Sequence, residues 1–291
     1  MTTLLTPRNT GILFAVLATL FFSVMDAMSK SLVVTHSVWF ILMVRYWFHL
    51  VVAIIWASLS KQGLRGAMAT KRPALQLIRG FLLVSEIALI IYAYSMLGLA
   101  DVTTIIMVHP LIVTGLAVLF LGEYVSLRRV MALVLGLVGL AIIMQPGSNM
   151  WSYGGVVALA ATTTFALYQL FTRMVSAYDN VMTSFFYAGL TGVVLTTYMG
   201  LTHMPPLDQI NWLLVVGICI FSTAAHFSVM KALSLTQASA IQPFTYLQIV
   251  WSIPIGLLVF GTFPLWSTLL GAVMIVCAGL YSLRNSGPAK G

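Results

Sequence analysis

The chain has 291 residues, of which 60% are hydrophobic and 7% are charged, and its mean hydropathy is +1.03. An ordinary soluble domain has roughly 25% charged residues. This composition therefore excludes a soluble domain and indicates a membrane protein. The net charge of +8 raises the question of nucleic-acid binding, which the placement of the basic residues answers.

Ten apolar stretches are long enough, at about 18 residues or more, to cross a hydrocarbon core roughly 30 Å thick. We expect spans at residues 11–33, 38–59, 74–97, 102–121, 129–146, 153–175, 181–202, 211–234, 238–260 and 265–283. The runs are continuous and rich in Leu, Ala and Met, which favours helices over a lipid-facing β-barrel, whose strands alternate every second residue. The sequence therefore predicts an all-α integral membrane protein.

The basic residues report the orientation of these spans. Nine of the fourteen lie in tails or connections: Arg8, Lys61, Arg65, Lys71, Arg72, Arg128, Arg129, Arg284 and Lys290. All nine fall on one side when ten spans are threaded through, and the five connections on the opposite side contain none. By the positive-inside rule both termini are cytoplasmic, and nucleic acid is not an expected partner.

The first span carries a polar stripe. Thr19, Ser23, Asp26 and Lys30 follow one another at spacings of four, three and four residues, which places them on one helical face. A charge inside the bilayer costs at least about 2.5–3.5 kcal/mol on insertion scales, so each needs a partner or water. Asp26 and Lys30 either neutralise each other or lie beside a transport pathway, with Lys30 as a gate on its outer side.

The third span contains an acid near its middle. Glu86 lies in the stretch "GFLLVSEIALIIYAYSML", Gly80 to Leu97. It is either a protonatable group that lines a wet cavity or a carboxyl group that a partner neutralises in helix packing. Arg79, seven residues earlier, lies on nearly the same face, and we expect its charged end to reach toward cytoplasmic water.

Histidine and proline interrupt the fourth span at His109-Pro110, where the proline removes a backbone donor and can open a carbonyl group toward a cavity. His109 and His226, in the eighth span, are either packed and hydrogen-bonded or are substrate contacts and proton carriers.

The sixth span repeats the polar stripe of the first with Gln169 and Arg173. The predicted threading places Arg173 near the inside, so Lys30 and Arg173 would serve opposite gates.

The ninth span carries polar side chains at helical spacing. Its candidate contacts are Gln242, Thr245, Tyr246, Gln248 and Trp251, with Pro243 and Pro254 nearby. Tyr94, Tyr168 and Tyr246 either form an apolar aromatic wall or are ordinary helix packing. Amides, hydroxyls and rings together suit a zwitterion or another small polar solute with an apolar portion.

An internal repeat divides the chain. Residues 11–30 and 154–173 share five identities, and Ala93, Ser95 and Gly122 recur 139 residues later. Each half then holds five spans, and an odd number means that the second half enters the bilayer from the opposite face. Such inverted repeats are frequent in secondary transporters, whose site lies near the midplane between the halves. We therefore expect a central cavity.

The expected organisation is a cytoplasmic tail at 1–10, five-helix repeats at 11–146 and 152–283, and a second cytoplasmic tail at 284–291. The sequence has no Walker motif, so we expect no ATP hydrolysis by this chain. Cys219 and Cys277 both lie inside predicted helices, which favours packed thiols over a metal or disulfide pair. We expect no cofactor and no metal.

The segment "AYSMLGLADVTTIIMVHPLIVTGLAVLFLGEYVSLRRVMALVLGLVGLAII" and its echo "ALSLTQASAIQPF" resemble the EamA repeat of the drug/metabolite transporter superfamily. The matching features are an alanine-led helix end, the acidic Asp101, and Leu121-Gly122-Glu123 after the fourth helix. The resemblance covers about 11–283 and is strongest to bacterial amino-acid exporters of the YddG type. The second half departs from the pattern, because Phe260-Gly261-Thr262 stands where Leu-Gly-Glu would.

The resulting hypothesis is a secondary transporter that exports amino acids or related metabolites across a bacterial cytoplasmic membrane by alternating access. One alternative is a proton-coupled drug or cation exporter, which Asp26 and Glu86 keep open. Another is an intramembrane lipid-group transferase, but the six acids are scattered rather than clustered, so we expect no enzyme. A monomer is sufficient, and a homodimer remains open.

Overall fold

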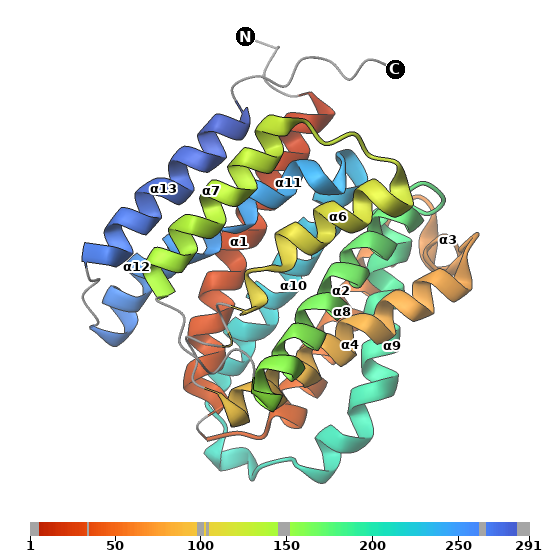
Figure 1. Cartoon of the computed structure of the whole chain (residues 1–291). Helices are drawn as coiled ribbons and strands as arrows, with labels where there is room; N and C mark the ends of the chain where they lie inside the picture. The colour runs from red at the N-terminus through yellow and green to blue at the C-terminus, as the bar shows by residue number, and fades with distance from the viewer. Residues whose placement is uncertain are drawn as a thin grey trace.

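The computed structural model describes residues 6–33, 35–97, 102, 105–144, 152–261 and 266–283. Within these ranges the secondary structure is helical and no strand is present, which confirms the all-α expectation (Figure 1). The helices are α1 Pro7–Val33, α2 Val38–Leu59, α3 Gly63–Met68, α4 Pro73–Met96, α6 His109–Leu121, α7 Leu127–Met144, α8 Tyr153–Val175, α9 Val181–Thr202, η2 Leu207–Gln209, α10 Trp212–Leu235, α11 Ala238–Thr245, α12 Leu247–Phe260 and α13 Trp266–Leu283.

Seven helical segments in the described ranges are long and apolar enough to cross a membrane: α1, α2, the first 18 residues of α4, α8, α9, α10, and α11 with α12 taken together over Ala238–Val259. Two further apolar helices, α6 and much of α13, are shorter. These lengths support the membrane class that the composition indicates.

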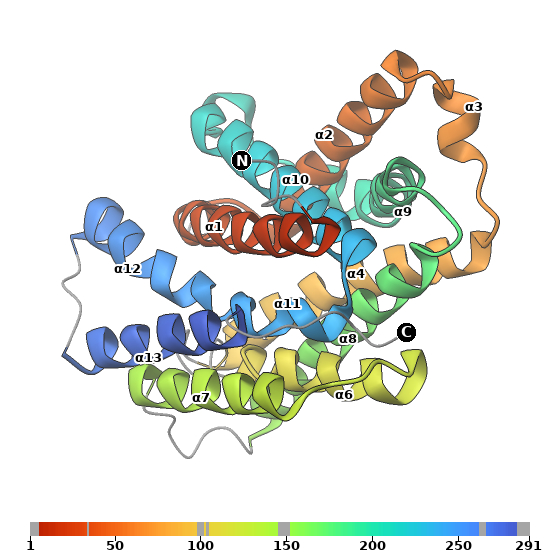
Figure 2. The same cartoon turned by 90° about the horizontal axis from the view of Figure 1, so that it is seen from above.

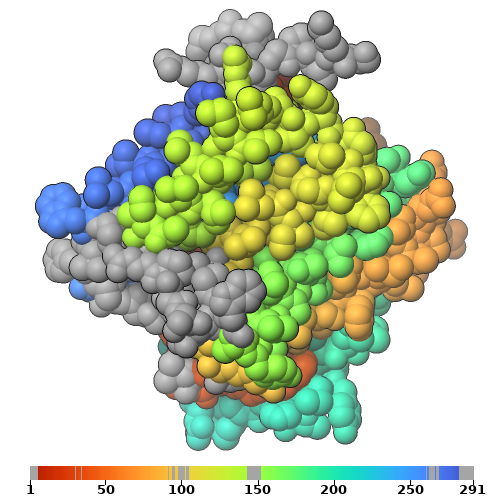
Figure 3. All heavy atoms as spheres, in the orientation of Figure 1, coloured from red at the N-terminus to blue at the C-terminus, as the bar shows by residue number. Residues whose placement is uncertain are grey.

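The outer surface is apolar where a lipid-facing surface should be. Figure 3 shows one face formed largely by α6, α7 and α8. On α7 the exposed large side chains are Leu127, Val130, Met131, Val134, Leu135 and Val138. A contiguous apolar surface of this kind is rare on soluble proteins and normal in contact with lipid.

Two predicted spans differ from the observed helices. The span 102–121 is a continuous helix only from His109, because Pro110 has no N–H group to bond the carbonyl group of Ile106. The His109 ring supplies the missing donor, because its Nδ1 donates to the Ile106 carbonyl oxygen at 3.1 Å.

The span 238–260 is divided at Tyr246, where α11 ends and α12 begins. Ile249 N–H bonds the Tyr246 carbonyl oxygen at 3.1 Å, three residues back, in a tight 3₁₀-type turn. Pro243 inside α11 and Pro254 inside α12 each remove one ladder bond from this region.

Helix packing follows the internal repeat. If α1, α2, α4, α6 and α7 correspond to α8, α9, α10, α11–α12 and α13, then α1 on α10 corresponds to α8 on α4, and both pairs pack closely. The pair α1–α12 likewise corresponds to α8–α6, while α2–α9, α6–α11 and α7–α13 each correspond to themselves. Figure 2 shows α7 and α13 lying side by side. The second half is therefore packed against the first in a twofold-related pattern.

Several second-half helices begin at a side chain that satisfies free backbone N–H groups. Ser152 caps α8 through Gly155 N at 3.3 Å, Asn180 caps α9 through Thr183 N at 2.8 Å, and Asn211 caps α10 through Leu214 N at 3.2 Å. The cap residue of α11, Gln237, makes no such bond. Its helix is capped from the other half of the chain.

Candidate functional site

The polar stripe of α1 faces α12. Trp251 Nε1 donates to Thr19 Oγ1 at 3.1 Å, Ser23 Oγ donates to the Gln248 carbonyl oxygen at 2.7 Å, and Gln248 Nε2 donates to Asp26 Oδ2 at 2.8 Å. Thr19 and Ser23 are buried, whereas Asp26 is exposed to solvent. The stripe is thus a seam between the two halves that reaches the surface of the bundle at its Asp26 end.

Two predicted site residues lie outside what can be described. The side chains of Lys30 in α1 and Tyr94 in α4 are not among the described ones, and neither is Asp101 of the family motif. The Asp26–Lys30 pair and the outer gate at Lys30 therefore stay predictions.

Arg45 of α2 is a functional candidate that the sequence analysis did not single out. It is partly exposed, its Nη2 lies 3.2 Å from Met25 Sδ, and the charges of Asp26 and Glu86 both act on it. The cost that draws attention to acids inside a span applies equally to an arginine seven residues into α2. That signal was present in the sequence.

These charged groups lie at a common depth. Asp26 is seven residues from the end of α1, and Arg45 is seven residues from the start of α2. At 1.5 Å per residue, each is about 10 Å from its helix end. The helices therefore bring a cation and an anion together below one end of the bundle.

Glu86 of α4 joins this group from the buried side. It is 7% exposed, and the cation that acts on it is Arg45, with Asp26 as the nearby acid. Neither acid forms an ion pair within 4.0 Å in the described part of the chain, where that contact is limited to Arg173 and Glu123. Glu86 is thus a buried acid without an ion pair among the described residues, and its role as a cavity group or as a neutralised packing group stays a prediction.

Gln169 of α8 and Gln242 of α11 form a buried amide pair between helices. Gln242 Nε2 donates to Gln169 Oε1 at 3.1 Å and to the Ala238 carbonyl oxygen at 3.0 Å. Gln242 Oε1 is buried and has no hydrogen-bond partner among the described residues. Thr245 instead bonds within its own helix, to the Gln242 carbonyl oxygen at 2.7 Å.

The candidate aromatic and histidine residues are dispersed. Tyr168 and Tyr246 are both fully buried but lie in different hydrophobic clusters. His109 packs edge-on to Phe165, with ring centroids 5.2 Å apart. His226 packs edge-on to Phe22 at 5.3 Å, and its Nδ1 has no hydrogen-bond partner among the described residues.

Arg79 does not extend to the surface as expected, because its side chain is fully buried. Its Nη2 donates to the Ser184 carbonyl oxygen of α9, and its guanidinium carbon lies 5.9 Å from the centroid of the Tyr168 ring. The neighbouring helices α8 and α9 enclose the Arg79 side chain. The expectation from the sequence considered α4 alone, and on an isolated helix the side chain could reach water.

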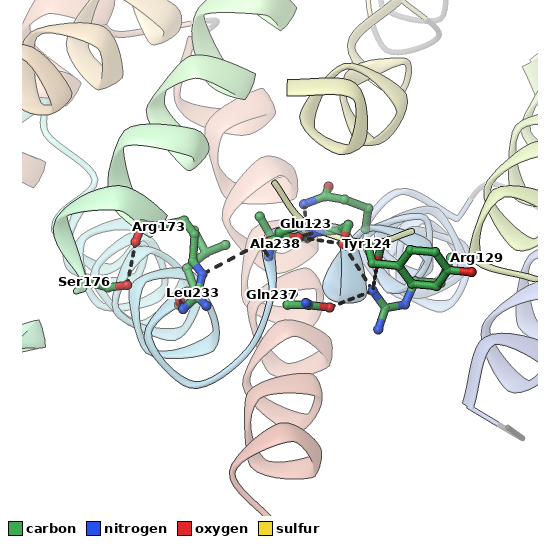
Figure 4. A network of polar contacts seen from close by, with 10 residues as sticks. Glu123, Tyr124, Arg129, Arg173, Ser176, Leu233, Gln237 and Ala238 are labelled. Carbon is green, nitrogen blue, oxygen red and sulfur yellow. Dashed lines mark hydrogen bonds and ion pairs between the residues drawn. The ribbon is translucent and has the colours of Figure 1, made fainter. Parts of the chain in front are cut away.

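A cluster of polar side chains joins the two halves at one end of the bundle, and its central residue is Glu123 (Figure 4). Its two carboxylate oxygens accept from Ala238 N at 2.9 Å, Ser239 N at 3.0 Å and Ser239 Oγ at 2.6 Å. These are free donors in the first turn of α11, where a negative charge is also favoured by the helix dipole. Glu123, from the end of α6, thus caps a helix of the other half.

Two arginines complete this cluster. We call it the clasp, and it consists of Glu123, Arg129, Arg173, Gln237 and Ser239. Arg173 Nη1 donates to the Leu233 carbonyl oxygen at 2.9 Å, and its Nε lies 3.8 Å from Glu123 Oε1. Arg129 Nη1 donates to Gln237 Oε1 at 2.8 Å and to Ser239 Oγ at 3.3 Å. Four helices, α6, α7, α8 and α11, meet through these side chains.

A pocket of about 630 Å³ adjoins the clasp. It lies between the ends of α6 and α8, with Phe120, Glu123, Arg173, Tyr178 and Gln237 in its wall. A second pocket, of about 380 Å³, is lined by apolar residues of α2, α9 and α10. Neither wall contains Asp26, Glu86 or Gln242, so the central cavity expected from the sequence stays a prediction.

A second polar cluster lies in the connections at the same end as the clasp. Asp179, between α8 and α9, accepts from Thr70 Oγ1, from Lys71 N at 3.0 Å and from Gln76 Nε2 at 2.9 Å. Partial burial raises the pKa of Asp179, but these hydrogen bonds and the Lys71 charge outweigh it and bring the pKa below its ordinary value.

The described residues contain no group of three or more His, Cys, Asp or Glu side chains able to hold a metal ion. Cys219 and Cys277 are both free thiols.

The same fold occurs in a protein of known structure. One crystal structure superposes with a TM-score of 0.83 at 15% identity, covering 95% of this chain and 98% of the other, a similarity that establishes the fold alone.

Curated relatives with transporter names match most of the chain. A riboflavin transporter of Vibrio cholerae is 28% identical over 77% of this chain and 76% of its own, and an S-adenosylmethionine uptake transporter of Rickettsia bellii is 26% identical over 77% of each. A pseudopaline exporter of Pseudomonas aeruginosa is 26% identical over 93% of this chain and 94% of its own.

The family model for EamA-like transporters matches the chain twice, at residues 9–145 and 152–284. The two matches together cover nearly the whole sequence and coincide with the two sets of helices that pack in a twofold-related pattern. This chain is therefore a multi-pass membrane protein that belongs to the EamA-like transporter family.

Proposed function

We propose that this chain is a secondary transporter that exports amino acids or related small metabolites across a bacterial cytoplasmic membrane by alternating access. The observation that carries the proposal is the position of its polar side chains. Glu86 and the Gln169–Gln242 pair are buried between helices of both halves, while the exposed Asp26 and the partly exposed Arg45 lie about 10 Å below one end of the bundle. Charged and amide side chains inside a membrane cost free energy unless partners or water satisfy them. Their presence here is explained if they bind a solute.

The proposed topology has ten spans in two inverted five-helix repeats, with both termini in the cytoplasm. The first described helix begins and the last one ends at the same end of the molecule (Figure 1). That arrangement supports an even number of crossings, and the positive-inside rule assigns this end to the cytoplasm.

With that topology, the clasp closes the cytoplasmic end and the Asp26–Arg45 group faces the outside. Asp26 is exposed while Arg79, Gln169 and Gln242 are enclosed. The structure thus supports an outward-facing state, and Glu123 and Arg173 are proposed as the inner gate. Opening that gate requires the α11 end to leave the carboxylate of Glu123.

The substrate class is proposed from the charges. Arg45 can bind a carboxylate, while Asp26 and Glu86 can bind an ammonium or another cationic group. Because relatives carry names for riboflavin, S-adenosylmethionine and pseudopaline, the assay should include solutes beyond amino acids.

The test is flux in sealed liposomes that contain the purified chain and no ATP. We expect uptake of at least one radiolabelled solute from a panel of the twenty amino acids, riboflavin and S-adenosylmethionine. Asp26→Asn and Arg45→Gln should each reduce that flux at least tenfold. Asp208→Asn, at an exposed site in η2, is the matched control and should leave it unchanged. Tight vesicles with no flux for any solute would count against the proposal.

A proton-coupled drug or cation exporter is the second candidate, and the burial of Glu86 without an ion pair among the described residues favours it. Glu86→Gln cannot exchange a proton. If that variant keeps the flux and its dependence on an imposed pH gradient, the coupling role of Glu86 is abandoned.

A further inference from the structure

Arg79 is a buried cation that forms no ion pair with an acid among the described residues. Its side chain is fully buried in α4, and only Nη2 makes a hydrogen bond, to the Ser184 carbonyl oxygen. Nε and Nη1 are buried and have no hydrogen-bond partner among the described residues. A guanidinium group has five N–H donors in a planar fork that fits two oxygens of one anion.

The nearest acid that acts on Arg79 is already occupied. Asp179 is the carboxylate whose charge reaches it, but both oxygens of Asp179 accept bonds from Thr70, Lys71 and Gln76. Asp179 also lies outside the 4.0 Å limit of an ion pair with Arg79 in the described structure. In the described part of the chain, Nε and Nη1 therefore have no anion to bind, and the aromatic ring beside the guanidinium group is that of Tyr168.

Polar groups connect Arg79 to the surface at the end that carries the clasp. Gln76 lies one turn earlier on α4, with Nε2 bonded to Asp179 and to Ser184 Oγ at 3.2 Å, and with a buried Oε1 that has no partner. Asp179, Gln76, Ser184 and Arg79 thus form a polar column between α4 and α9. The column is a run of buried polar groups that leads from the connections at this end to Arg79.

We propose that Arg79 is a binding site for an oxyanion, the carboxylate or phosphate group of the transported solute, which reaches it when the clasp end opens. Glu86 follows seven residues later on α4 and Arg45 lies beyond it, so the solute's negative group passes between two arginines at different depths. This inference rests on the proposed transport function.

The experiment uses the purified full chain in lipid nanodiscs and a membrane-impermeant dicarbonyl reagent that modifies guanidinium groups. Mass spectrometry of peptides reports the labelling rate of Arg79 and, as a control, of the exposed Arg72. The probes are sodium acetate and sodium phosphate, compared with sodium chloride at equal ionic strength. We expect slow labelling of Arg79 in the folded protein and at least threefold slowing by one of the two oxyanions, with Arg72 unaffected.

The two anion arms separate a carboxylate site from a phosphate site. If Arg79 is labelled only after the protein unfolds, or at a rate that neither oxyanion changes, then Arg79 is a structural link between α4 and α9 and the proposal is wrong.

The thermal stability of two variants gives a second measurement that does not depend on labelling. Arg79→Lys keeps a cation and Arg79→Gln removes it, and both lose the fork geometry. We expect the oxyanion that protects Arg79 to raise the thermal unfolding midpoint of the wild type and, less, of Arg79→Lys, but not of Arg79→Gln. Equal shifts in all three would contradict the site. Absence of solute flux in the wild type would instead count against the transport function and leave the anion result standing.

Discussion

Glu123 shows how one side chain can connect a sequence motif to a mechanical role. Gly122 ends α6 in the left-handed region, with φ +62°, which places the next side chain across the gap to α11. Gly261 ends α12 in the same way, with φ +65°. The match of these two glycines at a spacing of 139 therefore reflects two helix ends of one shape, whereas Thr262, the counterpart of Glu123, lies outside the described residues.

Replacing Glu123 with Gln should weaken the clasp. The amide keeps one acceptor oxygen but turns an NH₂ group toward either the donor of Ala238 or the two donors of Ser239. Losing charge-assisted bonds and leaving buried donors unpaired should cost about 1.5–3 kcal/mol. We expect a lower thermal unfolding midpoint in detergent, whereas Asp208→Asn, in an exposed turn, should change stability by less than about 0.5 kcal/mol. Equal midpoints for the two variants would exclude a structural role for the clasp.

Asp179 should make part of the stability depend on acid. Its pKa in the folded chain is below the ordinary value of about 3.9, because hydrogen bonds to the carboxylate outweigh its partial burial. The stability it contributes is therefore complete above the unfolded pKa and is lost as the pH falls through the folded one. The wild type should be more stable than Asp179→Asn at pH 7, and this difference should shrink below about pH 4. Unfolding midpoints measured between pH 7 and pH 3 check this, and a constant difference would refute it.

Individual residues were predictable where helical spacing alone sets their neighbours. The stripe of Thr19, Ser23 and Asp26 follows from periodicity, and it does face the other half. The burial of Arg79 was not predictable, since a single span does not indicate which helices enclose it. The contact between Gln169 and Gln242 likewise depends on how α8 and α11 meet.

At the scale of helices, hydropathy placed most spans close to their observed ends, because the length of an apolar run is fixed by the bilayer. The break at Tyr246 was not predictable in position. Pro243 and Pro254 indicate lost ladder bonds, but the turn forms where Tyr246 is held against another helix. Its ring lies against Gly136 of α7, where a Cβ atom would be 2.5 Å from Tyr246 Cδ2.

Two glycine substitutions test this packing. Gly136→Ala places a methyl group against the fully buried Tyr246 ring and should destabilise the protein by about 1–3 kcal/mol. Gly115→Ala in α6 is the matched control, since outside its own helix backbone no atom of a described residue lies within 4 Å of the added Cβ. Because alanine has a higher helix propensity than glycine, this substitution should instead raise the stability by up to about 1 kcal/mol. Chemical unfolding in mixed micelles should order the variants in this way, and the reverse order would show that Tyr246 is free to move.

At the scale of the whole molecule, alternating access requires the clasp to open and close once in each cycle. The pocket beside it has one wall from each half, with Phe120 on α6 and Ala177 after α8. A covalent link between these walls should hold the clasp end shut in every state. Transport by a rocking motion of two bundles then stops, whereas a fixed pore would still conduct.

This gives the most direct test of the mechanism. Phe120→Cys with Ala177→Cys, in a Cys219→Ala and Cys277→Ser background, is cross-linked with a cleavable bismaleimide. We expect flux in liposomes to fall to the level of empty vesicles and to return when the linker is cleaved. Each single-cysteine variant, treated with the same reagent, should keep its flux and so separates linking from modification. Full flux in the linked protein would mean that the two halves do not need to part at this end, and that the solute path lies elsewhere.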